Sequence, residues 1–160
     1  MRVIDYRRED AVAYAKRWAL GRNPDYYDFS ELGGDCTNFA SQCLYAGAGI
    51  MNTTPVFGWY YFSPEDRAAA WTGAVYLLRF LLENAGLGPF GRVVDRANVR
   101  IGDPIFLLRQ DDTPFHTVIV TERTPTIRIA AHTNDALDRT LRSYTNGRPL
   151  YLHIDGVRVP

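Results

Sequence analysis

Gly33-Gly34-Asp35-Cys36-Thr37-Asn38-Phe39 is the stretch from which the fold of this chain is best predicted. Cys36, Phe39 and Cys43 are spaced by three and four residues, which places them on one face of a helix. The spacing predicts a helix over residues 35–46 with Cys36 in its first turn. There the helix dipole and unpaired N–H groups favour the thiolate, the nucleophilic form of cysteine. A small buried cysteine in a core helix is the alternative, and this stretch does not separate the two.

Helical periodicity also precedes and follows this stretch. Apolar residues recur at helical spacing over residues 9–20, and glycine and proline follow them. A Ser-Pro pair at residues 63–64 resembles a helix cap and predicts a short helix that runs to residue 71. Residues 72–85 predict a further, longer helix.

The second half of the chain changes from helical to β-type periodicity. Short apolar runs separated by turns predict strands at residues 106–108, 117–120, 127–131 and 150–154. Because helices come first and strands follow, the sequence predicts an α+β fold rather than alternating βαβ units. No repeat or linker interrupts residues 1–160, so one domain is expected.

Composition and charge exclude several function classes. Eighteen Lys and Arg residues balance eighteen Asp and Glu residues, which argues against nucleic acid or an anionic membrane as the partner. No apolar run approaches the roughly 18 residues of a membrane span, and the first eight residues lack the apolar region of a signal peptide. We therefore expect a cytoplasmic protein by default, or a module whose export signal lies elsewhere.

The cysteines and histidines show no metal-ligand spacing. Cys36 and Cys43, on one helix, would have Cα atoms about 10 Å apart, too far for a disulfide. His116, His132 and His153 are isolated from one another in the sequence. The sequence also lacks a glycine-rich phosphate loop. No metal and no cofactor are therefore predicted.

A cysteine nucleophile needs a base, and His116 is the candidate. It stands at the start of the apolar run 117–120, directly after the turn residues 111–114. A titratable residue at the start of an apolar strand is typical of a site at the edge of a sheet. The alternative is that His116 is a surface histidine in a loop. His153 lies inside an alternating strand and is assigned a structural role.

The hairpin after His116 predicts which residues lie beside it. If the turn is centred on Thr124-Pro125, the residue numbers of two residues that face each other across the hairpin add up to about 249. His116 then lies opposite Thr133. A one-residue change in loop length moves the partner to His132 or Asn134. The group that orients the imidazole is expected in this cluster, because a catalytic imidazole must be held in the correct tautomer. The choice among the three stays open.

Residues 50–68 form an irregular connection rich in proline and aromatic residues. Long irregular segments in compact domains are often functional. We expect a groove wall or lid in which Trp59 contacts the substrate, and packing of these aromatic rings against the core is the alternative.

Several motifs resemble those of known cysteine hydrolases. GDCTNF at residues 34–39 resembles the Asp-Cys-Ser-Gly-Phe signature of NlpC-type cell-wall peptidases and CHAP amidases. IGDPIF at residues 101–106 and FHTVIV at residues 115–120 resemble two of their strands. GGDCTNFASQC at residues 33–43 and AHTND at residues 131–135 resemble more closely the bacterial putative amidase domain family, the sixth amidase class. That likeness extends over nearly the whole chain.

The resemblance implies a papain-like, NlpC-type fold in which a nucleophile helix packs on a small antiparallel sheet. It also implies a triad with Cys36 as nucleophile, His116 as base, and His132 or Asn134 as the orienting group.

The resemblance further implies a set of residues that contact the substrate. An oxyanion hole would combine the Cys36 backbone N–H with the Tyr26 or Tyr27 hydroxyl, and Asp35 is expected to contact the substrate as well. Thr37-Asn38 stands where the peptidases have Ser-Gly, so peptidase-like substrate geometry is not implied.

The predicted function is a cysteine amidohydrolase that cleaves a cell-wall peptide or an N-acyl amide through an acyl-enzyme. Acyl transfer by the same triad is one alternative. A catalytically inactive domain that binds the cell wall or a protein partner, or a scaffold in which Cys36 is merely buried, is another.

Overall fold

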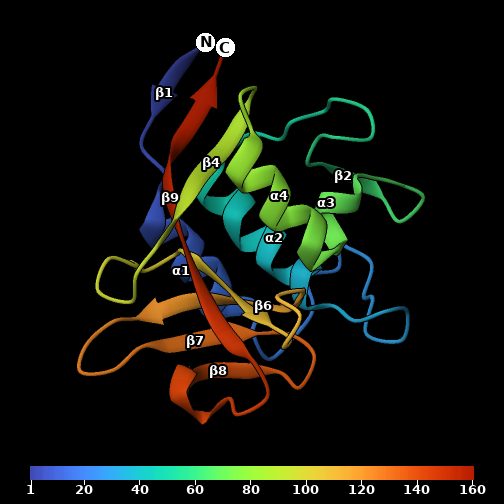
Figure 1. The fold of residues 1–160 in the computed structure, drawn as a ribbon. Helices are drawn as coiled ribbons and strands as arrows, with labels where there is room; N and C mark the ends of the chain where they lie inside the picture. Colours follow the sequence, from blue (N-terminus) through green and yellow to red (C-terminus); the bar gives the residue numbers. More distant parts are fainter.

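A seven-stranded sheet forms the centre of the computed structural model, which describes residues 1–160. Its strands pair in the order β1-β9-β5-β6-β7-β8, and β4 pairs with β9 as well. Every pairing is antiparallel, and the two chain ends lie side by side on β1 and β9 (Figure 1). The strands are β1 (Arg2–Ile4), β4 (Gly88–Val94), β5 (Pro104–Leu108), β6 (Pro114–Glu122), β7 (Arg128–Ala131), β8 (Ala136–Thr140) and β9 (Arg148–Val159).

The helices gather on one side of this sheet (Figure 1). They are α1 (Arg8–Trp18), α2 (Cys36–Ala48), α3 (Ala69–Thr72) and α4 (Ala74–Glu83), and a 3-10 turn, η1 (Leu141–Ser143), follows β8. Helix α2 packs between α1, α3 and β6, and ten of its thirteen residues are buried. Mixed helices and an antiparallel sheet confirm the predicted α+β class. None of the helices combines the length and apolar character needed to cross a membrane.

The central strands are buried on both faces. Alternate residues of a strand point to opposite sides of a sheet. Phe106 and Ile119 accordingly join the larger core beneath the helices, whereas Leu107 and Val118 join a smaller core on the other face. This second core is closed by residues of β8 and η1. Burial on both faces explains why the strands read as continuous apolar runs instead of alternating ones.

The predicted elements are recovered except around residues 61–72, and the structure adds three strands that were not predicted, β1, β4 and β8. The helices predicted at 9–20, 35–46 and 72–85 correspond to α1, α2 and α4. The helix predicted to begin at the Ser-Pro pair is wrong. A short hairpin of β2 (Tyr61–Ser63) and β3 (Asp66–Arg67) occupies this segment, and α3 begins only afterwards. Proline suits the second position of a turn as well as the first position of a helix, and here the turn is formed.

The predicted hairpin register is confirmed. Strands β6 and β7 pair Ile119 with Ala130 and Val120 with Ile129. Since β7 ends at Ala131, residues 132–135 form the next turn at the same end of the sheet where β6 begins. The polar cluster of the sequence therefore lies at the edge from which the N-terminus of α2 is reached.

Candidate active site

Cys36 is the first residue of α2, as predicted, with Asp35 at the N-cap position. Its side chain is half-buried, and its sulfur lies 3.7 Å from the Thr37 hydroxyl oxygen. Cys43, about two turns further along the same helix, is fully buried, and burial raises the pKa of its thiol well above the usual value. Only Cys36 combines access with a helix N-terminus, the position that favours a thiolate.

His116 lies on the strand that packs against the start of α2. The hydroxyl groups of Thr37 and Thr117 are 3.0 Å apart and buried, so the residues that follow Cys36 and His116 touch. Strand alternation directs Thr117 toward α2 and His116 toward the second core. The structure therefore brings the two predicted residues onto contacting segments, without a hydrogen bond between their side chains.

The His116 ring is free of partners within the chain. Neither ring nitrogen makes a hydrogen bond, and neither is among the enclosed polar atoms that lack one. Burial, reinforced by the positive charge of Arg139, lowers the pKa of His116 from 6.5 to about 4. At neutral pH the imidazole is therefore uncharged, which is the form that accepts a proton.

The structure corrects the orienting role predicted for His132. Its Nδ1 donates to the buried Asp35 carboxylate at 2.5 Å, and its Nε2 lies 2.8 Å from the Trp18 carbonyl oxygen and 3.1 Å from Arg22 Nη1. Phe39 stacks on the ring at a centroid distance of 4.0 Å. Both nitrogens are thus occupied by groups other than His116.

Asp35 is likewise an anchor, which corrects its predicted contact with substrate. Only 1% of the residue is exposed. Besides the bond from His132, its carboxylate accepts the Phe29 backbone N–H at 2.8 Å and the Asn38 side-chain amide at 2.9 Å. A carboxylate with these three donors fixes the loop that leads into α2.

The side chains of Thr37 and Asn38, which stand where the peptidases have Ser-Gly, make hydrogen bonds inside the protein. Thr37 contacts β6 through Thr117. The Asn38 amide donates to the Tyr27 carbonyl at 2.9 Å, and its oxygen accepts the Trp71 indole N–H at 3.0 Å. Both side chains point away from the solvent side of Cys36 and brace the start of α2.

The turn after β7 sits against the same helix start. The Asp35 backbone N–H donates to the Thr133 hydroxyl at 3.1 Å, and Arg22 holds the Asp135 carboxylate with two contacts of 3.0 Å. Thr133 and Asn134 both have positive φ, at 60° and 57°. The Asn134 side chain is exposed and makes no hydrogen bond, so its orienting role stays a prediction.

Among the aromatic residues predicted to bind substrate, Trp59 belongs to the core. It is fully buried, it packs on Trp71 at 4.8 Å between ring centroids, and its indole N–H donates to Ser41 at 3.0 Å. Tyr26 is half-buried, and burial raises its pKa to about 12. Tyr27 is 46% exposed, with its ring edge against Phe29. Of the three, only Tyr27 offers a large exposed surface.

Tyr144 and Arg139 are neighbours of the site that the sequence did not reveal. The Tyr144 ring lies 5.8 Å from the His116 ring between centroids, and the Arg139 guanidinium lies 3.7 Å from the Tyr144 centroid. The Tyr144 hydroxyl is buried without a hydrogen bond. Burial raises the pKa of Tyr144, the neighbouring Arg139 opposes this rise, and the charge of Cys36 adds a smaller rise. No motif surrounds either residue: Arg139 lies on β8, and the position of Tyr144 depends on the turn after that strand.

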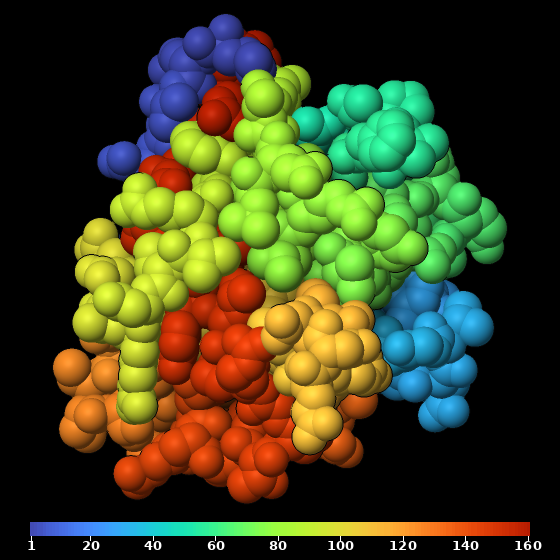
Figure 2. All heavy atoms as spheres, in the orientation of Figure 1, coloured from blue at the N-terminus to red at the C-terminus, as the bar shows by residue number.

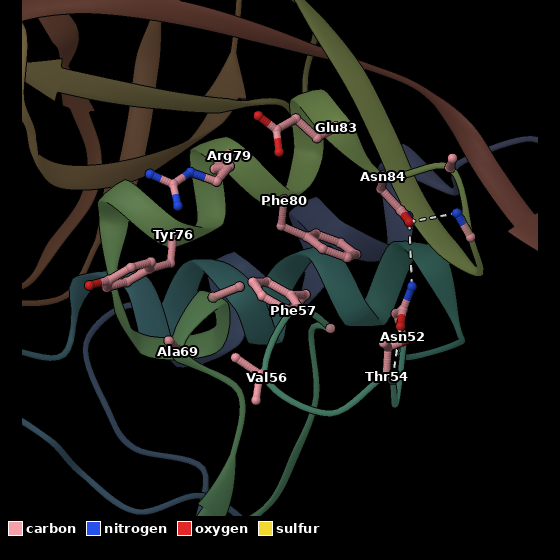
Figure 3. Close-up of a pocket in the computed structure, with 14 residues that line it drawn as sticks. Asn52, Thr54, Val56, Phe57, Ala69, Tyr76, Arg79, Phe80, Glu83 and Asn84 are labelled. Atoms are coloured by element: carbon pink, nitrogen blue, oxygen red, sulfur yellow. Dashed lines mark hydrogen bonds between the residues drawn. The ribbon is translucent and has the colours of Figure 1, made fainter.

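Two further observations bear on where a ligand could bind. In Figure 2 the segment that enters β6, in amber, lies beside the loop that enters α2, in light blue, and Cys36, at the end of that loop, is only half-buried. A cavity of about 420 Å³ lies elsewhere, between α4 and residues 52–58. Phe57 and Val56 line it opposite Phe80 (Figure 3). None of the residues around Cys36 lines this cavity.

Comparison with known proteins gives a family and one relative. The family model described as a putative amidase domain matches residues 5–153. Uncharacterized protein YhbB of Bacillus subtilis (strain 168) is 35% identical over 122 residues, which is 74% of this chain and 38% of that protein. The chain thus spans less than two fifths of this relative's length. No solved structure matches the chain. A match over nearly the full length, on the motifs that build the site at Cys36, means that the chain belongs to the putative amidase domain family.

Proposed function

We propose that this protein is a cysteine-dependent amidohydrolase with a papain-like fold related to NlpC-type and CHAP enzymes. The observation that carries the proposal is the half-buried thiol of Cys36 at the start of α2, on a segment in contact with that of an uncharged His116. A cell-wall peptide or an N-acyl amide is the substrate class, and we expect neither nucleic acid nor membrane as a partner.

The reaction begins with transfer of the Cys36 thiol proton to His116. The His116 ring, which has no partner to give up, must turn from the second core toward the sulfur when substrate binds. The charge of Cys36 acts on Tyr144, which lies beside the His116 ring, and this supports a short path between the two groups. The thiolate attacks the amide carbonyl, and the Cys36 backbone N–H at the helix N-terminus stabilises the oxyanion. The C–N bond breaks as His116 returns the proton to the leaving amine. Water then cleaves the thioester, with His116 as base, and releases the acid.

Supporting residues have separate tasks in this proposal. Asp35 and His132 hold the loop and helix start that position Cys36. Asn134 remains the candidate for orienting His116, since its side chain is free. The Tyr27 hydroxyl is preferred to that of Tyr26 for the oxyanion, because Tyr27 is the more exposed of the two.

The test is alkylation by iodoacetamide as a function of pH, with adducts mapped by mass spectrometry. Cys36 should react at neutral pH faster than a free peptide thiol, and buried Cys43 serves as the internal control. If Cys36 is alkylated no faster than a free peptide thiol, the proposal is wrong. Hydrolysis of fluorogenic N-acyl amides by wild type and Cys36→Ala then identifies the bond, and added amine acceptors distinguish hydrolysis from acyl transfer.

A binding role is the second candidate, favoured by the cavity beside α4. Phe57 is 82% exposed and Val56 is 71% exposed on its rim. If Cys36→Ala keeps the full biological effect while Phe57→Ala loses it, the chain is a binding module and not an enzyme.

A further inference from the structure

A small cavity lies on the face of the sheet opposite α2. Its volume is about 130 Å³. It is lined by Arg96, Leu107, Leu141, Arg142, Tyr144 and Tyr151, among others, and no acidic residue takes part. Two guanidinium groups and two phenol rings on an apolar floor are typical of a site for an anionic group.

This cavity adjoins the candidate active site. Leu107 stands directly across from His116 in the β5–β6 register, and cross-strand partners project from the same face of a sheet. Tyr144 links the two places, because it lines the cavity and lies beside the His116 ring. The charge of Cys36 also acts on Tyr144, so the thiol lies within electrostatic range of a residue that lines the cavity. A substrate with its amide at Cys36 would then extend past His116 to reach the cavity.

The positive charge around the cavity is unbalanced. Arg96 and Arg142 side chains are exposed and form neither an ion pair nor a hydrogen bond with the rest of the chain. Arg139, stacked on Tyr144, donates to Ser143, at 2.8 Å to its hydroxyl and 3.4 Å to its carbonyl oxygen, and its charge acts on the Tyr144 hydroxyl. No carboxylate pairs with any of the three.

The Tyr144 hydroxyl is the second observation that points to a ligand. A buried hydroxyl without a hydrogen bond costs stability unless something satisfies it. It is one of only two enclosed side-chain polar atoms in the chain that lack a partner. Because the hydroxyl is enclosed in the free protein, a ligand oxygen in the cavity would supply that partner after a shift of the Tyr144 side chain.

We propose that this cavity is a subsite for a carboxylate carried by the amide substrate, bound by Arg96 and Arg142 with the Tyr144 hydroxyl. The inference rests on the proposed hydrolase function and narrows its substrate class. Arginine pairs with carboxylates through two parallel hydrogen bonds. The volume suits a carboxylate on a short side chain, since whole drug-sized ligands occupy about 300–1,000 Å³.

The experiment uses two reagents that differ only in charge, bromoacetylglycine and its neutral amide, bromoacetylglycinamide. Each alkylates a thiolate by displacing bromide, so the ratio of their rates at Cys36 measures selection of the carboxylate without any substrate. We expect the anionic reagent to react roughly tenfold faster with the wild type. The ratio should fall to that of a free peptide thiol in the Arg96→Gln/Arg142→Gln variant and decrease partly in Tyr144→Phe.

Arg2→Gln is the matched control. It removes one exposed positive charge from β1, at the opposite edge of the sheet from β8, and should leave the ratio unchanged. Both cavity arginines are exposed and unpaired, so their removal should leave the melting temperature within about a degree or two of wild type.

Two failures are distinguishable in this design. A wild-type ratio equal to that of a free thiol, or an unchanged ratio in the double variant, overturns the subsite. Slow alkylation of Cys36 by both reagents overturns the activated nucleophile, and the ratio still decides the subsite. Cys36-dependent hydrolysis without a preference for carboxylate-bearing amides over their neutral analogues would support the hydrolase function and contradict the proposed subsite.

Discussion

Two regions meet at the start of α2, and they differ in how their polar groups are satisfied. On the side of Asp35 the carboxylate, the His132 ring and the Asn38 amide are all engaged in hydrogen bonds. On the side of His116 the imidazole and the Tyr144 hydroxyl have no partner in the chain. We call them the anchored side and the open side. Saturated groups hold a backbone in place, whereas unsatisfied ones are available to a ligand or a reaction.

Removal of the thiol should have the largest effect and tests whether the open side carries the chemistry. Cys36→Ala should abolish hydrolysis, a loss of at least about 10³-fold, because no other nucleophile lies at the helix start. Its thermal stability should match that of wild type, since the half-buried sulfur makes few contacts. Cys43→Ala is the control, with activity retained and a lower melting temperature. Equal hydrolysis by wild type and Cys36→Ala would assign the chemistry elsewhere.

The anchored side should respond to mutation through stability. Asp35→Ala leaves His132 and the Phe29 N–H without a buried partner and should lower the free energy of unfolding by about 3–5 kcal/mol. Denaturant titration measures this. Asp10→Asn, in an exposed pair with Arg7, should change it by no more than about 1 kcal/mol.

A double-mutant cycle with His132→Ala sharpens the assignment. If Asp35 and His132 act as one unit, the double variant should cost much less than the sum of the single variants. Additive losses would mean that the 2.5 Å contact is not the source of the stability.

Local signals in the sequence predicted much of this arrangement. The start of α2 at Cys36 follows from helical spacing over a few residues, and the β6–β7 register follows from one hairpin. Strand β4 was missed because Gly88, Pro89 and Gly91 hide its pattern. Glycine and proline are rare in strand interiors, so that segment resembled a loop.

The division into an anchored and an open side could not be predicted from the sequence, because it depends on contacts between residues far apart in the chain. Asp35 and His132 are 97 positions apart, and nothing local indicates which partner a histidine takes. His132 was therefore one of the three residues considered as the orienting group of His116, its neighbour in the hairpin. Composition likewise cannot tell whether an aromatic ring such as Trp59 lines a groove or fills a core. Tyr144 reaches the site only through the path of the turn after β8.

The pH dependence of stability isolates the open side. The pKa of His116 is lowered to about 4 in the folded protein, while the unfolded chain keeps the ordinary value near 6.5. The unfolded state therefore binds more protons between these values, and the folded state loses stability as the pH falls from about 6.5 to 4. His116→Gln removes that contribution, on the order of 3 kcal/mol at full effect.

The measurement compares the free energy of unfolding of wild type and His116→Gln at pH 7 and pH 4.5. The wild type should lose more stability than the variant on acidification. The same loss in both proteins would mean that His116 titrates normally and that its uncharged state at neutral pH is not enforced by the fold.

The smallest expected effect concerns the link between the two sides, the buried contact between the hydroxyls of Thr37 and Thr117. Thr37→Val or Thr117→Val leaves one buried hydroxyl unpaired and should cost about 1–2 kcal/mol, whereas the double variant should approach wild-type stability because both polar groups are gone. Iodoacetamide alkylation of each variant adds a second readout. If the link serves mainly to place Cys36 beside the His116 strand, the double variant should regain stability but react several-fold more slowly at Cys36. If the double variant regains both its stability and its alkylation rate, the contact between the two hydroxyls contributes only to packing. The position of Cys36 would then depend on the anchored side alone.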